Sequence, residues 1–411
     1  MPESPNDREV LRTLAAQVAE AAALPIHREK ADLWRRLNRL EKVRPLVWIN
    51  EVCWNEMGPE VDLQCQDPFC RTHEETLRQV LYQWRHLPAD MVVEPVLWSP
   101  LVIRDSGYGL QVRAAKADGP LWGAVHYIPV IHDEADVEKI QTPIIVLDRA
   151  AGDRQCDRLM QLVGDLLPVR QRGVTDYWFA PWDLLIQYYG IQEAMMDMIL
   201  RPALVHKAVG RMVDVMISRL DQLQAQGALA LNNGYHRVGS GGLGYTDLLP
   251  QKDFDGVHVR PMDLWGTATA QIFSEVSPAM HEEFALRYEL RWLERFGLNC
   301  YGCCEPLHHK IGLLKAIPRL RRISISPKAN LEQAAAAIGD RCVFSIKPNP
   351  AVLATDTWHP EAARRALRDS LEKARGCRIE IIMKDISTVR RDPPRLWEWS
   401  RMAMEEAERL A

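Results

Sequence analysis

Residues 277–304, SPAMHEEFALRYELRWLERFGLNCYGCC, contain a helical pattern that leads directly into a strand-like run. Apolar side chains recur at helical spacing as far as Gly297, and glycine is a typical residue just beyond a helix C-terminus. The apolar run at 298–304 is typical of a buried strand. A helix followed by a buried strand is half of the repeating unit of a parallel α/β sheet.

Similar strand-like runs occur along the whole chain, and 195–227 shows the same helical periodicity between two of them. The predicted strands are 46–50, 91–98, 174–180, 228–233, 298–304, 322–326, 342–347 and 379–384. Alternation of these strands with helices predicts an α/β fold, a single (β/α)8 TIM barrel domain over 1–411. An open doubly wound sheet is the alternative, but no GxGxxG follows the first strand, and GSGGLG at 239–244 lies far from it.

Three further segments are predicted outside the repeating units. Residues 1–43 form a helical N-terminal extension that packs outside the barrel. An insertion after the second strand, 108–147, has alternating runs around ADGP at 117–120 and predicts an antiparallel excursion. A second insertion, 234–275, follows the fourth strand, and its His258 and Asp263 are candidates for a lid, because such insertions lie on the face that carries a barrel's active site.

Composition excludes several classes of protein. The 411 residues carry a net charge of −4 without blocks of like charge, which excludes a nucleic-acid binder. No apolar run approaches the roughly 18–20 residues of a membrane span, and the N-terminus is polar, so we expect a cytoplasmic protein with no membrane association. The 9 cysteines, an odd number, suit free thiols or metal ligands in a reducing compartment.

Reactive side chains stand where the predicted strands end. Because the carboxyl ends of parallel strands meet at one edge, we expect these side chains to converge. They are Glu51, Asn232, Cys303, Cys304, Glu305, His308, Lys347, Lys384 and Asp385.

The segment 301–310, YGCCEPLHHK, carries the strongest signal among them. Pro306 suits the first turn of a helix, so Cys303 and Cys304 would lie at its N-terminus, where the helix dipole favours a thiolate. A thiolate suits zinc binding or alkyl transfer. Two buried cysteines with Glu305 capping a helix remain the alternative.

The other candidates also have structural alternatives. Glu51 is a general acid or metal ligand, or it pairs with a strand-end lysine. Lys347 and Lys384 anchor an anionic substrate, or they pair with Asp385 and Glu305. Glu275 is the nearest upstream carboxylate for a site at Cys303, or it compensates the charge of a helix N-terminus. The tryptophans Trp98, Trp178 and Trp265 form a pocket, or they pack in the core.

Segments 277–297, 298–308, 321–333, 342–350 and 379–388 resemble the uroporphyrinogen decarboxylase-like superfamily, in its branch of corrinoid-dependent methyltransferases of the O-demethylase type. The resemblance covers about 275–390 and implies a (β/α)8 barrel. Uroporphyrinogen decarboxylase itself is disfavoured, because its members open with an arginine-rich motif, whereas INEVCWNEM at 49–57 carries Glu51 and Glu56 and no arginine.

The resemblance also implies a zinc site. The family's His-x-Cys pair corresponds to Tyr301-Gly302-Cys303, and Asp385 stands where the family has a later cysteine. Glu275 resembles the acidic residue that some ether-demethylating members carry upstream of the cysteine. Cys303, Glu275 and Asp385 are therefore the predicted metal ligands.

The implied activity is transfer of a methyl group between a small methylated substrate, such as an aryl methyl ether, and cobalamin carried by a separate corrinoid-binding protein. Glu51 or His308 would act as the acid, with Lys347 and Lys384 as further catalytic residues. The predicted substrate pocket contains Trp98, Trp178, Asn232, Trp265 and Glu305.

Two other functions stay open at this point. One is a metal-free decarboxylase or lyase that holds a small carboxylate with Lys347 and Lys384. The other is a non-enzymatic partner of a corrinoid protein. A homodimer is left open as the assembly.

Overall fold

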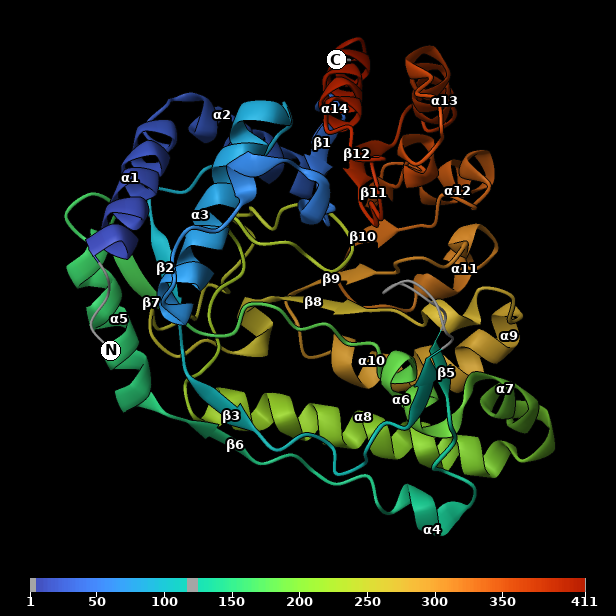
Figure 1. The fold of residues 1–411 in the computed structure, drawn as a ribbon. Helices are drawn as coiled ribbons and strands as arrows, with labels where there is room; N and C mark the ends of the chain where they lie inside the picture. Colours follow the sequence, from blue (N-terminus) through green and yellow to red (C-terminus); the bar gives the residue numbers. More distant parts are fainter. Residues whose placement is uncertain (1–4, 117–124, 411) are drawn as a thin grey trace.

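The computed structural model describes residues 5–116 and 125–410. Its centre is a parallel sheet of six strands in the order β1-β12-β11-β10-β9-β8. Figure 1 shows these strands side by side, with α11 to α14 along their outer side. The strands are β1 (Leu46–Ile49), β8 (Trp265–Ala268), β9 (Leu298–Tyr301), β10 (Leu320–Ser324), β11 (Val343–Ile346) and β12 (Arg378–Met383).

Helices connect these strands, as the periodicity predicts. The pattern at 277–297 forms α9 (Pro278–His281) and α10 (Arg287–Leu293), joined by a π-helical turn at Glu282–Leu286. The later connections contain α11 (Ile311–Leu314), α12 (Leu331–Ile338) and α13 (Pro360–Lys373), and α14 (Pro394–Glu408) follows β12. The pattern at 195–227 is divided into α7 (Ile191–Leu200) and α8 (Pro202–Ala225), because Pro202 starts a new helix.

The N-terminal extension is helical, as predicted, with α1 (Pro5–Ala22) and α2 (Ile26–Asn38). α1 lies beside α3 (Pro68–His86) and α5 (Arg149–Val163) (Figure 1). The remaining helices are α4 (Glu134–Val137) and α6 (Pro181–Tyr189). No helix in the described part of the chain is both long and apolar enough to cross a membrane.

The predicted antiparallel excursion after the second strand is confirmed. β3 (Ile103–Asp105) pairs antiparallel with β6 (Ile145–Leu147), and β4 (Ala114–Lys116) pairs antiparallel with β5 (Val125–Tyr127). The ADGP turn at 117–120 lies outside the described residues.

Strand alternation gives the central sheet two different faces. In β12, Ile381 and Met383 belong to the large apolar cluster that includes Leu367 of α13 and Met402 of α14. Ile382 points the other way, into a second cluster with Trp48 and with Trp34 of α2. We call this second side the inner face. Because Lys384 is two residues beyond Ile382, its side chain also lies on the inner face, at the strand's carboxyl end.

The inner face contains a buried ion pair that is covered by a glycine-rich loop. Arg322 and Glu380 are fully buried, with Nε and Oε1 3.2 Å apart. The backbone N–H of Gly242 donates to Glu380 Oε1 at 2.9 Å, and Gly242 O accepts from Arg322 Nη1 at 3.0 Å. GSGGLG at 239–244 therefore packs against the sheet, and its glycines permit the close approach.

Three predicted strands are largely wrong. Of 91–98, only the end belongs to a strand, β2 (Leu97–Pro100), which pairs parallel with β7 (Val169–Arg172). Segments 174–180 and 228–233 share a single bridge, between Val174 and Leu229. The apolar residues of these runs are explained by burial, since Val93, Phe179 and Ala228 all lie in the protein interior. Burial alone does not require strand pairing, and in the described residues no ladder closes the sheet from β1 to β8.

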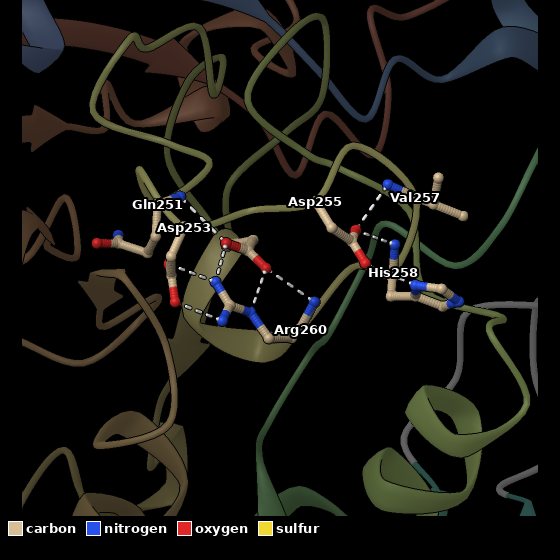
Figure 2. Close-up of polar contacts among 7 residues, drawn as sticks. Gln251, Asp253, Asp255, Val257, His258 and Arg260 are labelled. Atoms are coloured by element: carbon tan, nitrogen blue, oxygen red, sulfur yellow. Dashed lines mark hydrogen bonds and ion pairs between the residues drawn. The ribbon is translucent and has the colours of Figure 1, made fainter.

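The second insertion was also predicted with wrong limits, because its end, Trp265–Ala268, is the central-sheet strand β8. Its middle part contains a group of local ion pairs and hydrogen bonds (Figure 2). Arg260 pairs with Asp253 at 2.7 Å and with the buried Asp263 at 3.0 Å, and His258 pairs with Asp255 at 2.6 Å. The two lid candidates, His258 and Asp263, thus contact residues of the insertion itself, and the lid stays a prediction.

We predict that Gly242→Ala destabilises the protein by about 1–3 kcal/mol, because overpacking has costs of this order. The new Cβ would lie 2.5 Å from the Trp34 ring and 2.8 Å from Glu380 Oε2. The matched control is Gly312→Ala in α11, where no heavy atom lies within 4 Å of the new Cβ. Urea unfolding followed by circular dichroism measures both. Equal midpoints for the two variants would contradict the packing described here.

Candidate functional site

The carboxyl ends of the central strands bring together reactive side chains from distant parts of the chain. We call this side of the sheet the carboxyl edge. The residues that follow β1, β9, β11 and β12 there are Glu51, Cys303, Cys304, Lys347, Lys384 and Asp385. All six side chains belong to the set that the sequence predicted to converge, and the contacts below connect them.

The Cys303 thiol lies between a second thiol and a lysine. Its Sγ is 3.4 Å from Cys304 Sγ and 3.7 Å from Lys384 Nζ, and Lys347 Nζ donates to the Cys303 carbonyl oxygen. The hydrogen bond from Cys304 lowers the pKa of Cys303 to about 6, and the charges of Lys347 and Lys384 act in the same direction against burial. The pKa of Cys304 is raised, because its proton is held in that hydrogen bond. Cys303 is therefore mostly a thiolate at neutral pH.

The sequence predicted a thiolate stabilised by a helix dipole, and the predicted cause is wrong. No helix begins at Cys303 or Cys304, because β9 is followed by a three-residue 3-10 helix, Leu307–His309, with Pro306 at its N-cap. The first α-helix after β9 is α11, which starts at Ile311. The stabilisation of the thiolate comes instead from side chains, namely the Cys304 thiol and two lysines.

Glu305 fixes the backbone around the thiolate. Its Oε2 accepts from Cys303 N at 2.9 Å, and its Oε1 accepts from Thr269 Oγ1 at 2.6 Å and from Ala270 N at 3.1 Å. The side chain is fully buried. Both carboxylate oxygens therefore bind protein donors, so Glu305 connects the Cys303 loop to the segment after β8.

Glu51 and Asp385 form a carboxyl pair beside the thiolate. Arg237 Nη1 is 2.5 Å from Glu51 Oε1, and Lys384 Nζ is 3.5 Å from Glu51 Oε2 and 3.2 Å from Asp385 Oδ1. Although burial opposes it, the hydrogen bond from Asp385 and the two cations lower the pKa of Glu51 to about 2. Burial and the hydrogen bond to Glu51 raise the pKa of Asp385. Of the two carboxyl groups, Asp385 is therefore the one that takes up a proton first as pH falls.

The two site lysines have different surroundings. Burial lowers the pKa of Lys347, whose ammonium group donates to a carbonyl oxygen. Burial also acts against Lys384, but the charges of Cys303, Glu51 and Asp385 raise its pKa overall. The predicted alternatives in which Glu51 and Asp385 pair with a strand-end lysine are thus confirmed for Lys384.

Both members of the carboxyl pair have an unusual backbone conformation. Glu51 has φ +53° and Asp385 has φ +57°. This left-handed region is sparsely populated by residues other than glycine, asparagine and aspartate, and such residues cluster at functional sites. The backbone places the two carboxyl groups together at some cost in stability.

Two site residues were missed by the sequence interpretation. Arg237 pairs with Glu51, and Ser240 Oγ is 3.3 Å from Lys384 Nζ. Both belong to the second insertion, which packs against the inner face. An isolated arginine next to a glycine-rich run was the available signal, but no periodicity indicates which sheet residues an irregular loop will contact.

Glu275 and His308 are not part of this cluster of contacts. Glu275 is exposed, and its charge acts on His309 and Lys310. His308 lines a 580 Å³ cavity together with Lys347, and its buried Nδ1 has no hydrogen-bond partner in the described part of the chain. Within that part, no three or more His, Cys, Asp or Glu side chains are grouped so that they could hold a metal ion.

The predicted pocket residues are distributed over different places. Trp98 lines a 340 Å³ cavity, and Trp178 lines a separate 350 Å³ cavity. Trp265 is buried in β8, where its Nε1 donates to Gly244 O at 2.9 Å and the Arg322 guanidinium lies 5.3 Å from its ring. The Asn232 side chain bonds to Thr175 and to both backbone polar groups of Trp265. Trp265 and Asn232 therefore stabilise the fold.

We predict that iodoacetamide alkylates Cys303 with a pH midpoint near 6, because only the thiolate reacts and its fraction rises as pH increases through the pKa. Cys304→Ala removes the hydrogen bond to Cys303 and moves the midpoint to higher pH. Peptide mass spectrometry measures the extent of alkylation at each cysteine. Cys300 is the internal control, since burial raises its pKa to about 12 and it should stay unmodified. A Cys303 midpoint near 9 would contradict the described environment.

Comparisons with known proteins identify a similar fold but no family. No protein-family model and no curated protein matches the chain. A solved structure, a methyltransferase from Methanosarcina mazei, is similar with a TM-score of 0.53 over 92% of this chain and 98% of that chain, at 10% sequence identity. At this level of identity, the likeness shows that the two chains share a fold over nearly their whole lengths.

Proposed function

We propose that this protein is a methyltransferase that moves a methyl group between an aryl methyl ether and a corrinoid carried by a separate protein. The observation that carries the proposal is the carboxyl pair, in which Asp385, the member with the raised pKa, lies next to the Lys384 ammonium that also contacts Cys303 Sγ. The fold shared with a methyltransferase and the resemblance of segments within 275–390 to corrinoid-dependent methyltransferases support it.

Demethylation of an aryl ether needs a group that protonates the departing oxygen. As the C–O bond breaks, the methyl group passes to the corrinoid of the partner protein, and the bonding electrons stay on the phenolic oxygen. That oxygen takes the proton of Asp385, and the resulting carboxylate is stabilised by Lys384 at 3.2 Å. Lys384 and Arg237 offset the negative charge that develops during the step.

The 340 Å³ cavity offers a place for the aromatic ring of the substrate. Its lining includes Trp48, Trp98 and Tyr235, together with Arg237, the cation that pairs with Glu51. This volume lies within the range of small-molecule sites, which is about 300–1,000 Å³. An aryl ether bound against the aromatic side chains would have its polar end on the side of Arg237 and the carboxyl pair.

Zinc, which the family resemblance implies, would need three protein ligands around an open position. Asp385 and Cys303 both lie next to Lys384, but Glu275 is exposed near His309 and Lys310. Among the described residues, no three or more His, Cys, Asp or Glu side chains are grouped in a way that could hold a metal ion. The Lys384 ammonium already provides positive charge at 3.7 Å from Cys303 Sγ. Zinc does not fit this donor set, and our mechanism has no step through it.

A closed barrel is part of the same proposal. Asp90 N donates to Val47 O of β1 at 2.7 Å, and Thr269 N, just after β8, donates to Phe179 O at 3.2 Å. Between these segments, β2 pairs parallel with β7. We infer that 90–100 and 169–179 complete the wall from β1 to β8, so that the chain forms a TIM barrel with irregular pairing in this part.

The decarboxylase or lyase alternative is less well supported. It requires lysines that are free to bind a substrate carboxylate. Lys384 already contacts Cys303, Glu51 and Asp385, and Lys347 is buried against the Cys303 carbonyl oxygen.

We predict that Asp385→Asn lowers kcat by about a hundredfold or more, the usual contribution of a general acid. In the unmodified protein, kcat falls as pH rises through the raised pKa of Asp385, because the proton is lost, and Asp385→Asn abolishes this alkaline limb. Methylation of cob(I)alamin by a panel of methoxylated aromatics, followed by absorbance, measures both effects.

The matched control is Asp369→Asn, which changes an exposed carboxylate of α13 that pairs with Lys373. It should leave kcat unchanged. Failure of every methoxylated aromatic to methylate the corrinoid, or an undiminished kcat in Asp385→Asn, would contradict the proposal.

A further inference from the structure

The 350 Å³ cavity that contains Trp178 is separate from the proposed ether site. It lies between α6, α8 and α10, which pack side by side (Figure 1). Asp176 and Trp178 are exposed at its rim, Asp183 is half-buried, and Tyr177 and Trp292 are buried. The cavity therefore has a rim that is open to solvent and an inner wall that includes the buried rings of Tyr177 and Trp292.

The charges around this cavity are not balanced. Neither Asp176 nor Asp183 takes part in an ion pair within the described ranges 5–116 and 125–410. The single cationic side chain of the lining, Arg219, lies 2.6 Å from Asp105 and is neutralised there. Asp183 accepts from the neutral amide of Gln271, at 2.5 Å, and from the Trp178 side chain, and burial raises its pKa to about 6. A positively charged ligand would remove this imbalance.

The aromatic residues of the lining favour an organic cation over a metal ion. Four rings line the cavity, those of Tyr108, Tyr177, Trp178 and Trp292. In the described part of the chain, Trp178 has no ring or cation against its faces, although 39% of its surface is exposed. Indole faces attract ammonium groups, and aromatic cages are a common way to bind quaternary ammonium ligands.

Trp292 provides an independent sign of a ligand. Its side chain is 5% exposed and its ring stacks on Phe179, 4.4 Å between centroids. Its buried Nε1 donates to no acceptor in the structure as described. Buried donors are rarely left without a partner, and Trp292 is one of the residues that line the cavity.

From these observations we propose that the cavity binds a small organic ammonium compound that also carries an oxygen acceptor. Asp176 and Asp183 balance its charge, the rings of Trp178 and Tyr108 cover its alkyl groups, and Trp292 Nε1 donates to its oxygen. This ligand site is distinct from methyl transfer and does not depend on it.

Choline is a suitable probe, because it combines a quaternary ammonium group with a hydroxyl oxygen. Its neutral isostere, 3,3-dimethylbutan-1-ol, has the same shape without the charge. We predict that isothermal titration of the unmodified protein shows choline binding at least about tenfold more tightly than the alcohol. Equal affinities, or no saturable binding of choline, would overturn the proposal without any variant.

Variants locate the binding to this cavity. Asp183→Asn and Trp178→Ala should each weaken choline binding by about tenfold, and circular dichroism checks that they are folded. The matched controls are Glu94→Gln and Trp98→Phe, which change a carboxylate and an indole in the 340 Å³ cavity. They should leave choline affinity unchanged. Loss of binding in these controls, with retention in Asp183→Asn and Trp178→Ala, would assign choline to the other cavity and overturn the inference.

Discussion

A buried ammonium group needs negative charge around it, and the carboxyl edge of this protein is organised around that of Lys384. The side chain is 5% exposed, and its partners are the Cys303 thiolate, the Glu51 carboxylate, Asp385 and the Ser240 hydroxyl. An uncompensated charge in such a place would cost several kcal/mol. The partners come from the ends of three strands and from one insertion, so this single charge fixes the relative positions of four segments.

The same constraint operates in the middle of the sheet. Arg322 and Glu380 are fully buried on the inner face, and the backbone of Gly242 supplies hydrogen bonds to both. The loop that carries Gly242 also carries Arg237 and Ser240, which contact Glu51 and Lys384. The insertion therefore contacts buried charges in the middle of the sheet and at its carboxyl edge. Its packing against Arg322 and Glu380 positions Arg237 and Ser240 beside Glu51 and Lys384.

The sequence allowed prediction of the strands whose hydrophobicity and pairing coincide. β1, β9, β10, β11 and β12 each overlap a predicted run, because each is short, contains apolar side chains and is largely buried. Segment 174–180 is equally apolar, but its neighbours offer it little regular pairing. The short strand β8, WGTA, was missed because its glycine and threonine give no apolar run.

Predictability of the site followed the same physical division. Their positions at the carboxyl ends of predicted strands placed Glu51, Cys303, Lys384 and Asp385 at one edge of the sheet. In the structure, Lys384 contacts the other three. Arg237 and Ser240 could not be predicted, because an irregular loop has no period that indicates its contacts. The number of tryptophans in the sequence does not indicate where each one lies. Trp98 and Trp178 line different cavities, and Trp265 lies in the core.

The left-handed backbone at Glu51 and Asp385 has a consequence for how the protein can change. Glycine at either position would relax the local conformation and reduce a strain of about 1–2 kcal/mol, yet it would remove a carboxyl group from the pair. Selection for stability alone would favour glycine here, whereas selection for the carboxyl group of Asp385 and its raised pKa opposes it. These two positions are therefore where the thermal tolerance of the fold and its acid chemistry compete directly.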